Sequence, residues 1–149
     1  MIAGTRNSID HLIQPIDDVF EPVTPAEVGL IEEPVETPLP PSCASFLTGV
    51  GSCMFAGQAT VQACNGETLD IATFLGGRRS RSLLDELRRH EDYVAQKLVP
   101  IADTFFNDRY VLDPGTGKIH YIEYRAGKNR IVDVADLFDD FLMRITVEA

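Results

Sequence analysis

Alternating apolar and polar positions predict two β-hairpins, and the first covers residues 59–74. On both sides of Asn65-Gly66, apolar residues alternate with polar ones, as expected for a half-buried strand pair. These apolar residues are Val61, Ala63, Leu69 and Ile71. Asn-Gly is a strong hairpin signal because both residues tolerate the positive φ that a tight turn requires. We therefore expect a hairpin with one apolar face.

A second hairpin is predicted for residues 105–125, where the sequence Pro-Gly-Thr-Gly supplies the turn. The register that places Tyr110 opposite Tyr121 also places Asp108 opposite Glu123. Cross-strand tyrosine pairs stabilise adjacent strands by about 0.2–1 kcal/mol, which favours this register. Opposed carboxylates repel each other, so we expect nearby arginines to compensate them in a salt-bridge cluster.

Apolar positions with a helical period predict two amphipathic helices. The first begins at Ser82, which can cap a helix, and ends or kinks at Pro100. The second has a continuous apolar stripe on one helix face. The stripe consists of Val134, Leu137, Phe138, Phe141, Leu142 and Ile145. The prediction is an α+β fold, in which two amphipathic helices cover a small antiparallel sheet of two hairpins.

Residues 1–42 differ in composition from residues 43–149, which we expect to form the globular body. The first segment holds seven of the nine prolines, and proline interrupts helices and sheet ladders. Thr24 and Pro25 favour the start of a helix, but Gly29 limits that helix to about one turn. We therefore expect an extended, proline-rich N-terminal arm.

The arm carries apolar residues in short clusters. Those we predict to bind a protein partner are Ile9, Leu12, Ile13, Phe20, Leu30 and Ile31. Isolated helices as short as those in the arm are marginal in water, so a partner surface would have to hold them. Two interpretations stay open: the arm docks on a partner or neighbouring subunit, or it packs loosely on its own domain.

The negative charge is concentrated in the arm. The chain has a formal net charge of −10, and residues 1–42 contribute −7 from one arginine and eight carboxylates. An acidic chain is a poor general binder of nucleic acid, because phosphate affinity requires clustered Lys and Arg. No apolar run is long enough for a membrane helix, and the first residues lack a signal-peptide pattern. We expect a cytoplasmic protein, or a virion component if the chain is viral, with no membrane partner.

One strongly basic cluster precedes and enters the first predicted helix. It consists of Arg78, Arg79, Arg81, Arg88 and Arg89. Guanidinium groups bind carboxylates or phosphates through paired hydrogen bonds. Three interpretations stay open: a solvated helix start, a site for a nucleic-acid backbone, or a site for an acidic arm. We favour pairing between this cluster and the acidic arm of a neighbouring subunit.

The candidate catalytic and metal-binding motifs are incomplete. The sequence GTGK at 115–118 lacks the first glycine and the final Ser or Thr of a phosphate-binding loop. In the predicted register, Asp113 and Glu123 lie too far apart to share a metal ion beside Lys128. We therefore expect no catalytic residue, no metal site and no cofactor.

The cysteines and histidines do not form a recognisable site either. Cys43, Cys53 and Cys64 contain no Cys-x-x-Cys pair, and we interpret all three as reduced, buried thiols. No histidine is coupled to a thiol by sequence, and His90 is expected on a solvated helix face.

These features favour a non-enzymatic assembly or adaptor protein that docks a partner or neighbouring subunit through its acidic arm. Phage and viral structural proteins use such arms, which is an argument by analogy alone. A small acidic inhibitor that mimics the charge of nucleic acid is the alternative, and a metal-dependent hydrolase is a weaker one.

Overall fold

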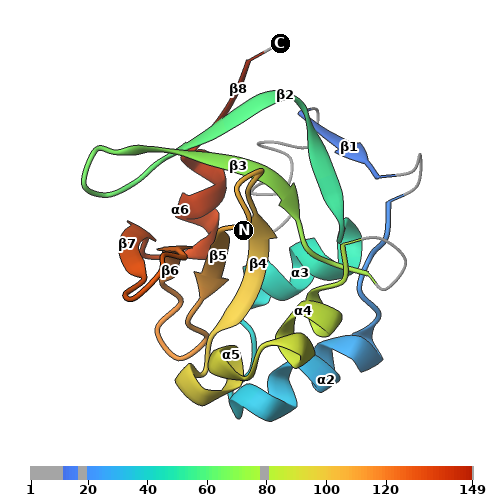
Figure 1. The fold of residues 1–149 in the computed structure, drawn as a ribbon. Coiled ribbons are helices and arrows are strands. Elements are labelled where there is room, and N and C mark those ends of the chain that lie inside the picture. Colours follow the sequence, from blue (N-terminus) through green and yellow to red (C-terminus); the bar gives the residue numbers. More distant parts are fainter. Residues whose placement is uncertain (1–11, 17–19, 78–80, 149) are drawn as a thin grey trace.

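The computed structural model describes residues 12–16, 20–77 and 81–148. In this part of the chain, eight antiparallel strands form one sheet, accompanied by five short helices (Figure 1). The strands are β1 (Ile13–Pro15), β2 (Cys53–Gln62), β3 (Thr68–Phe74), β4 (Val99–Asp103), β5 (Arg109–Leu112), β6 (Ile119–Glu123), β7 (Arg130–Ala135) and β8 (Ile145–Glu148). The helices are α2 (Pro25–Val35), α3 (Pro41–Gly49), α4 (Leu83–Arg89), α5 (Glu91–Gln96) and α6 (Phe138–Met143).

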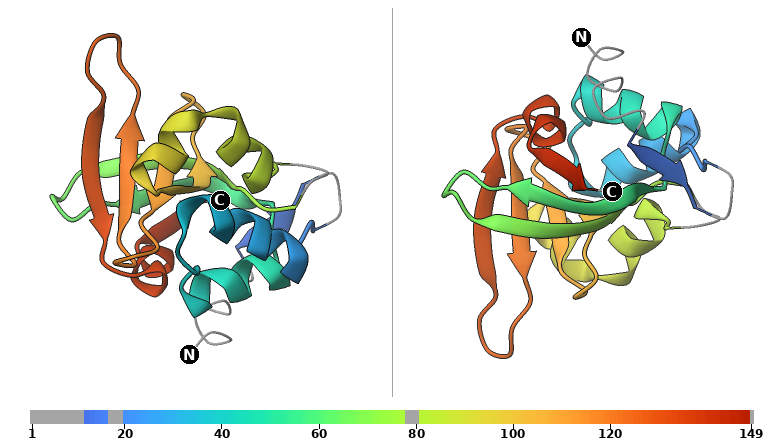
Figure 2. Two further views of the ribbon diagram at one scale, coloured as in Figure 1. Left: turned by 90° about the horizontal axis from the view of Figure 1, so that it is seen from below. Right: turned by 90° about the horizontal axis from the view of Figure 1, so that it is seen from above.

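The strands β1 to β7 are adjacent in chain order, and β8 pairs with β2. In both views of Figure 2, α3 and α6 lie on one side of the β2–β3 hairpin, and α4 and α5 lie on the other. Aromatic rings fill the core between these elements. Phe74 of β3 contacts Phe46 of α3 and Phe141 of α6, with ring centroids 4.7 and 6.1 Å apart. The sheet is therefore the surface on which α3, α4, α5 and α6 pack, whereas α2 packs mainly against α4 and α5.

Both predicted hairpins are present, and the register predicted for the second is confirmed. In β2–β3, Val61 pairs with Leu69, and Gly66 has the positive φ of 87° that the turn requires. In β5–β6, Tyr110 pairs with Tyr121 as expected. Hairpins are set by local turn chemistry and by alternation, and both signals are present in the sequence.

The expected fold, a small two-hairpin sheet covered by two helices with an extended arm, is wrong. The first predicted helix is two helices, α4 and α5, which meet at His90 in an extended conformation (φ −122°, ψ 107°). In the sequence, Ile101 continues the helical spacing of Leu84, Leu87, Val94 and Leu98. In the structure, Ile101 belongs to β4, whose five residues are all buried. A strand buried on both faces shows no alternation, so its apolar residues continued the helical period by chance.

The second predicted helix is also shorter than expected. Only six residues are helical in α6, while Val134 lies in β7 and Ile145 lies in β8. Leu137 is the residue before the helix and is 59% exposed. The apolar stripe is thus divided among three elements that surround one core.

The segment expected to be an extended arm contains a helix. Thr24 and Glu27 form a complete capping box, and α2 continues from there for 11 residues through Gly29. Ile31 and Val35 are fully buried in the common core. Tertiary packing therefore outweighs the unfavourable helix propensity of glycine.

Glycines allow the chain to pass close to itself beside β2. The backbone carbonyl of Glu21 accepts hydrogen bonds from the amides of Ser52 and Gly77, at 3.0 and 2.9 Å. A Cβ atom on Gly76 would lie 2.1 Å from the Ser52 nitrogen. Only glycine fits at this position, because the obstructing atom belongs to the backbone.

We predict that Gly76→Ala destabilises the protein by about 1–3 kcal/mol, the usual cost of overpacking. The matched control is Gly29→Ala, since a Cβ atom on Gly29 meets no atom within 4 Å. The control should stabilise α2 by about 0.5–1 kcal/mol. Urea unfolding measures both values, and a Gly76→Ala protein as stable as the wild type would contradict the packing described above.

Candidate functional site

A buried ion pair lies where α4 meets the start of β5. Nε of Arg109 donates to Oε2 of Glu86 at 2.9 Å, and the two side chains are only 13% and 7% exposed. The hydroxyl of Ser82 caps α4 by accepting from the Asp85 amide at 3.1 Å, which fixes the turn that carries Glu86. The ion pair therefore joins a capped helix to the sheet.

Two tyrosines extend the ion pair into a hydrogen-bonded chain. The hydroxyl of Tyr93 donates to Oε2 of Glu86 at 2.9 Å, and it lies 3.2 Å from the hydroxyl of Tyr124. Burial opposes ionisation of Glu86, but hydrogen bonds from Arg109 and Tyr93 hold the pKa of its carboxyl below the ordinary value. Burial, with the neighbouring Tyr124 and Glu86, raises the pKa of Tyr93. The Tyr93 hydroxyl therefore keeps its proton and remains a hydrogen-bond donor.

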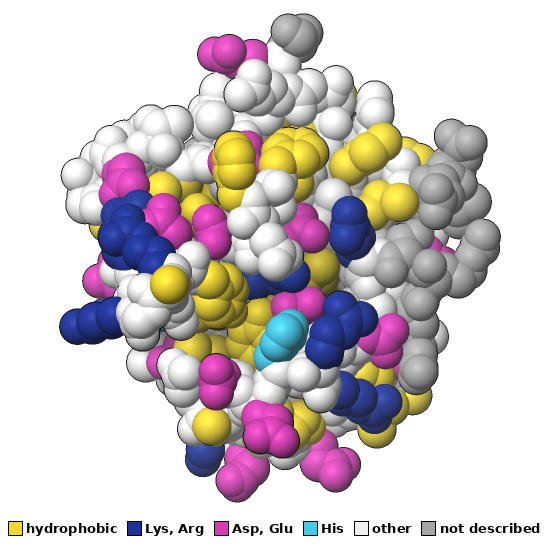
Figure 3. All heavy atoms as spheres, viewed as in Figure 1, with side chains coloured by type: hydrophobic (Ala, Val, Ile, Leu, Met, Phe, Trp, Pro, Cys, Tyr) yellow, Lys and Arg dark blue, Asp and Glu magenta, His cyan; other side chains and the backbone are white. Residues whose placement is uncertain are grey.

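A pocket of about 310 Å³ opens above these groups, and we call it the tyrosine pocket. Its walls are Tyr93, Tyr124, His90, Asp92 and Asn107, above Glu86 and Arg109. A smaller hollow of about 140 Å³ lies next to it and shares the ion pair. Figure 3 shows acidic, basic and hydrophobic side chains intermixed on this face of the molecule.

The turn between β4 and β5 borders the tyrosine pocket through Asn107. Residues 104–108, which we call the aromatic turn, expose Phe105 and Phe106 to 77% each. The hydroxyl of Thr104 accepts from the amides of Phe106 and Asp108, both at 3.1 Å. Asn107 has a left-handed backbone conformation (φ 68°), and its side-chain oxygen accepts from Nη2 of Arg109 at 3.1 Å, which further braces the turn. Two large apolar side chains are thus held in water by an ordered backbone.

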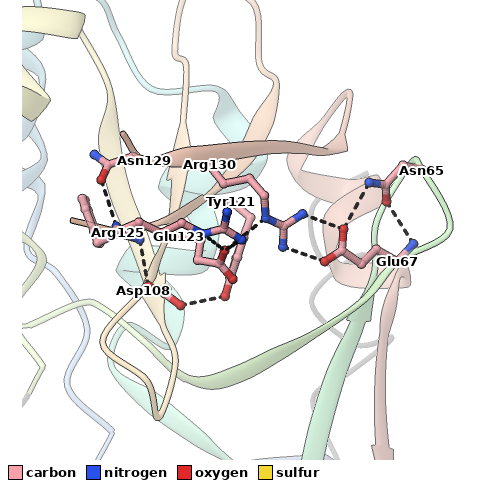
Figure 4. Close-up of polar contacts among 9 residues, drawn as sticks. Asn65, Glu67, Asp108, Tyr121, Glu123, Arg125, Asn129 and Arg130 are labelled. Carbon is pink, nitrogen blue, oxygen red and sulfur yellow. Dashed lines mark hydrogen bonds and ion pairs between the residues drawn. The ribbon is translucent and has the colours of Figure 1, made fainter. Parts of the chain in front are cut away.

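Asp108 and Glu123 do not share the salt-bridge cluster that the sequence predicts. Asp108 is buried, and its carboxylate accepts from the Tyr121 hydroxyl at 2.9 Å and the Tyr124 amide at 3.0 Å (Figure 4). Glu123 instead pairs with Arg125 and Arg130. Hydrogen-bond donors from the backbone and tyrosine satisfy the buried carboxylate, so no arginine is needed.

Arg130 joins the tip of the β2–β3 hairpin to β7. Its two Nη atoms donate to the two carboxylate oxygens of Glu67 at 2.8 and 2.7 Å, and its Nε donates to Glu123 at 3.1 Å (Figure 4). At the same tip, the amide and thiol of Cys64 donate to the carbonyls of Asp133 and Val134. The strand β7, which is last in the sheet order β1 to β7, therefore contacts the tip of the β2–β3 hairpin.

The residues predicted to bind a partner are dispersed over the structure. Ile31 is fully buried, and Ile13 is 7% exposed. Leu12 is half-buried, while Phe20 and Leu30 are 38% and 40% exposed. Ile9 lies outside the described residues. The burial of Ile13 and Ile31 removes them from the surface that a partner could reach.

The predicted basic cluster is brought together in part. Arg81 and Arg89 line the smaller hollow beside the tyrosine pocket, together with Asp85 and Asp103. Arg88 is exposed and does not line that hollow. The predicted residues Arg78 and Arg79 lie outside the described residues.

Other candidate chemistry has no support in the described part of the chain. Among the described residues, no three His, Cys, Asp or Glu side chains could hold a metal ion together. Cys43 and Cys53 are buried, and burial raises the pKa of both thiols to about 12. Cys64 is exposed, contrary to expectation, because it lies at the hairpin tip. No helix in the described ranges is long and apolar enough to span a membrane.

Sequence reasoning missed the residues that define this face. Tyr93 and Tyr124 are 31 positions apart, and no local pattern links them. The predicted hairpin segment 105–125 includes Phe105 and Phe106, although Asn107-Asp108 directly after them is a turn signal. No protein-family model matches this chain, and no curated protein has a significant sequence match to it.

We predict that Glu86→Ala destabilises the protein by about 3 kcal/mol, because it leaves the Arg109 guanidinium buried without its carboxylate. The double variant Glu86→Leu with Arg109→Met should recover much of that loss, since neither charge is then left alone. Urea unfolding of the single and double variants measures the difference. Equal losses in both would show that the ion pair is not what joins α4 to the sheet.

We also predict a pH-dependent effect of Arg130→Met. The hydrogen bond from Arg130 is the first cause that lowers the pKa of Glu67 from 4.5 to about 2. A carboxyl with a depressed folded-state pKa contributes stability above its unfolded pKa and loses it as the pH falls through the folded value. The difference in urea midpoint between wild type and variant should therefore be largest at neutral pH and shrink as the pH falls from 4.5 to about 2.

The matched control for Arg130→Met is Lys128→Met, because Lys128 is exposed on the β6–β7 connection, two residues before Arg130 at the start of β7. Its urea midpoint should follow that of the wild type at each pH. Arg130 also lowers the pKa of Glu123, so both of its carboxylate partners contribute to the pH dependence. A difference for Arg130→Met that stays constant across the range would contradict the assignment to these two ion pairs.

Proposed function

We propose that this protein is a non-enzymatic adaptor or assembly protein that docks a protein partner through the aromatic turn. The observation that carries the proposal is the exposure of Phe105 and Phe106 on a turn with a fixed backbone. Removing exposed apolar side chains from water lowers the free energy of a complex, so a partner that covers them is favoured. A fixed turn also loses little conformational entropy on binding, which favours affinity.

The neighbouring surface has the composition of an interaction site. Tyr124 is 44% exposed beside the aromatic turn, and Asn107 connects the turn to the tyrosine pocket. Aromatic residues are enriched among the side chains that contribute most to protein interfaces. We therefore place the centre of the docking surface at residues 105–106 and its edge at the tyrosine pocket.

The acidic arm has a smaller part in this proposal than its sequence suggested. Phe20 and Leu30 remain available to a partner, whereas Ile13 and Ile31 are used in the core. Neither alternative, an acidic inhibitor or a metal-dependent hydrolase, gains a supporting observation from the described residues. A cytoplasmic location, or a place in a virion, remains part of the proposal.

The test compares a Phe105→Ser/Phe106→Ser variant with the wild type. Tagged proteins would be used to capture partners from extracts of the cells that produce the chain, and mass photometry would detect self-association. The variant should weaken the interaction by about thirtyfold, which corresponds to the loss of a hot spot of about 2 kcal/mol. The fold should be retained, because both side chains lie outside the core.

The matched control is Met143→Ser, which removes another apolar side chain of 76% exposure from α6. The control should capture the same partner, or form the same oligomer, as the wild type. A folded double variant that keeps the partner or oligomer would overturn the proposal.

A further inference from the structure

We propose that the tyrosine pocket receives a lysine or arginine side chain from the protein that docks on the aromatic turn. This inference deepens the proposed function and rests on it. The pocket lies at the edge of the turn, since Asn107 belongs to both. A side chain projecting from a partner seated on Phe105 and Phe106 could therefore enter it.

The first argument comes from the aromatic walls of the pocket. His90 and Tyr93 meet edge to face with ring centroids 5.7 Å apart, and Tyr124 forms a further wall. Aromatic faces attract cations through their quadrupole and also cover the methylene groups of lysine or arginine. A volume of about 310 Å³ is enough for one such side chain.

The second argument comes from which hydroxyl groups donate and which accept in the hydrogen bonds that link Tyr124, Tyr93 and Glu86. The Tyr93 proton is donated to Glu86, so the proton between the two tyrosines must come from Tyr124. The oxygen of Tyr124 therefore keeps its lone pairs free to accept from a ligand. An ammonium or guanidinium group supplies the donors that this oxygen lacks.

The third argument is the charge that remains in the pocket. Arg109 uses all three nitrogens within the protein, on Glu86, on the Asp108 carbonyl and on Asn107, at 2.9, 3.0 and 3.1 Å. Its charge is balanced by Glu86 in the same contact. Asp92 is exposed, lines the pocket, and makes no hydrogen bond or ion pair with any described residue. The uncompensated charge is therefore a carboxylate, which favours a cation.

The smaller hollow next to the tyrosine pocket does not make the site better suited to an anion than to a cation. Arg81 and Arg89 line it, but Asp85 and Asp103 line it as well. The basic and acidic side chains there are equal in number, so no net positive charge is offered at the edge of the tyrosine pocket.

The test is a titration of the ¹⁵N-labelled full-length chain with Nα-acetyl-lysine methylamide, followed by NMR. The amides of Asp92, Tyr93 and Tyr124 should shift in a saturable way. The norleucine analogue has the same length without the charge, and the acetyl-glutamate analogue has the opposite charge. Both should bind at least about fivefold more weakly, given the combined charge and cation–π contributions.

Two variants assign the binding to the pocket. Asp92→Asn and Tyr124→Leu should each weaken binding of the lysine probe by about two- to fivefold. Asp136→Asn, an exposed carboxylate beside α6, is the matched control and should leave the affinity unchanged. The spectra themselves report whether each variant is folded.

Three results would overturn the inference: equal binding of the norleucine analogue, tighter binding of the glutamate analogue, or no saturable shift at the pocket. The titration needs no partner protein, so its outcome is separate from the capture experiment. Saturable lysine binding with no captured partner would contradict the proposed function alone. Partner capture that depends on Phe105 and Phe106, without lysine binding, would contradict the pocket assignment alone.

Discussion

The carboxylate of Glu86 is the interaction on which this face of the molecule depends. One oxygen atom accepts from Arg109 of β5 and from Tyr93 of α5, so a single buried charge joins α4, α5 and the sheet. A buried charge is tolerated only when its partners are in place, which makes the arrangement all-or-none. The tyrosine pocket exists because these groups hold its floor and walls in a fixed geometry. The aromatic turn benefits as well, since Arg109 also donates to Asn107 and to the Asp108 carbonyl.

The parts of the fold that the sequence predicts correctly are those with local causes. Asn65-Gly66 requires a tight turn, and alternation on both sides of it sets the register. The capping box at Thr24 and Glu27 likewise starts a helix where it was expected. Its length was underestimated because Ile31 and Val35 are stabilised by the core, which lies far away in sequence.

The errors arise where burial on all sides hides the period of the chain. The residues of β4 are buried without exception, so Ile101 fits a helical stripe as well as it fits a strand. The candidate site was missed for a related reason. Glu86 has the position of an ordinary first-turn acid in a helix, and only the fold brings Arg109 and Tyr93 to it. The two exposed phenylalanines could not be told from core residues until the turn that holds them was known.

The pairing of β8 with β2 has a consequence for how the protein folds. Val61 pairs with Ile145, and Gln58 pairs with Glu148, so these contacts join residues 84 and 90 positions apart in the sequence. Contacts of such long sequence separation slow folding, because a large loop must close before they form. Until β8 is in place, this part of the β2 edge is unpaired, so a folding intermediate that lacks β8 can pair through it with another unfolded copy of the protein.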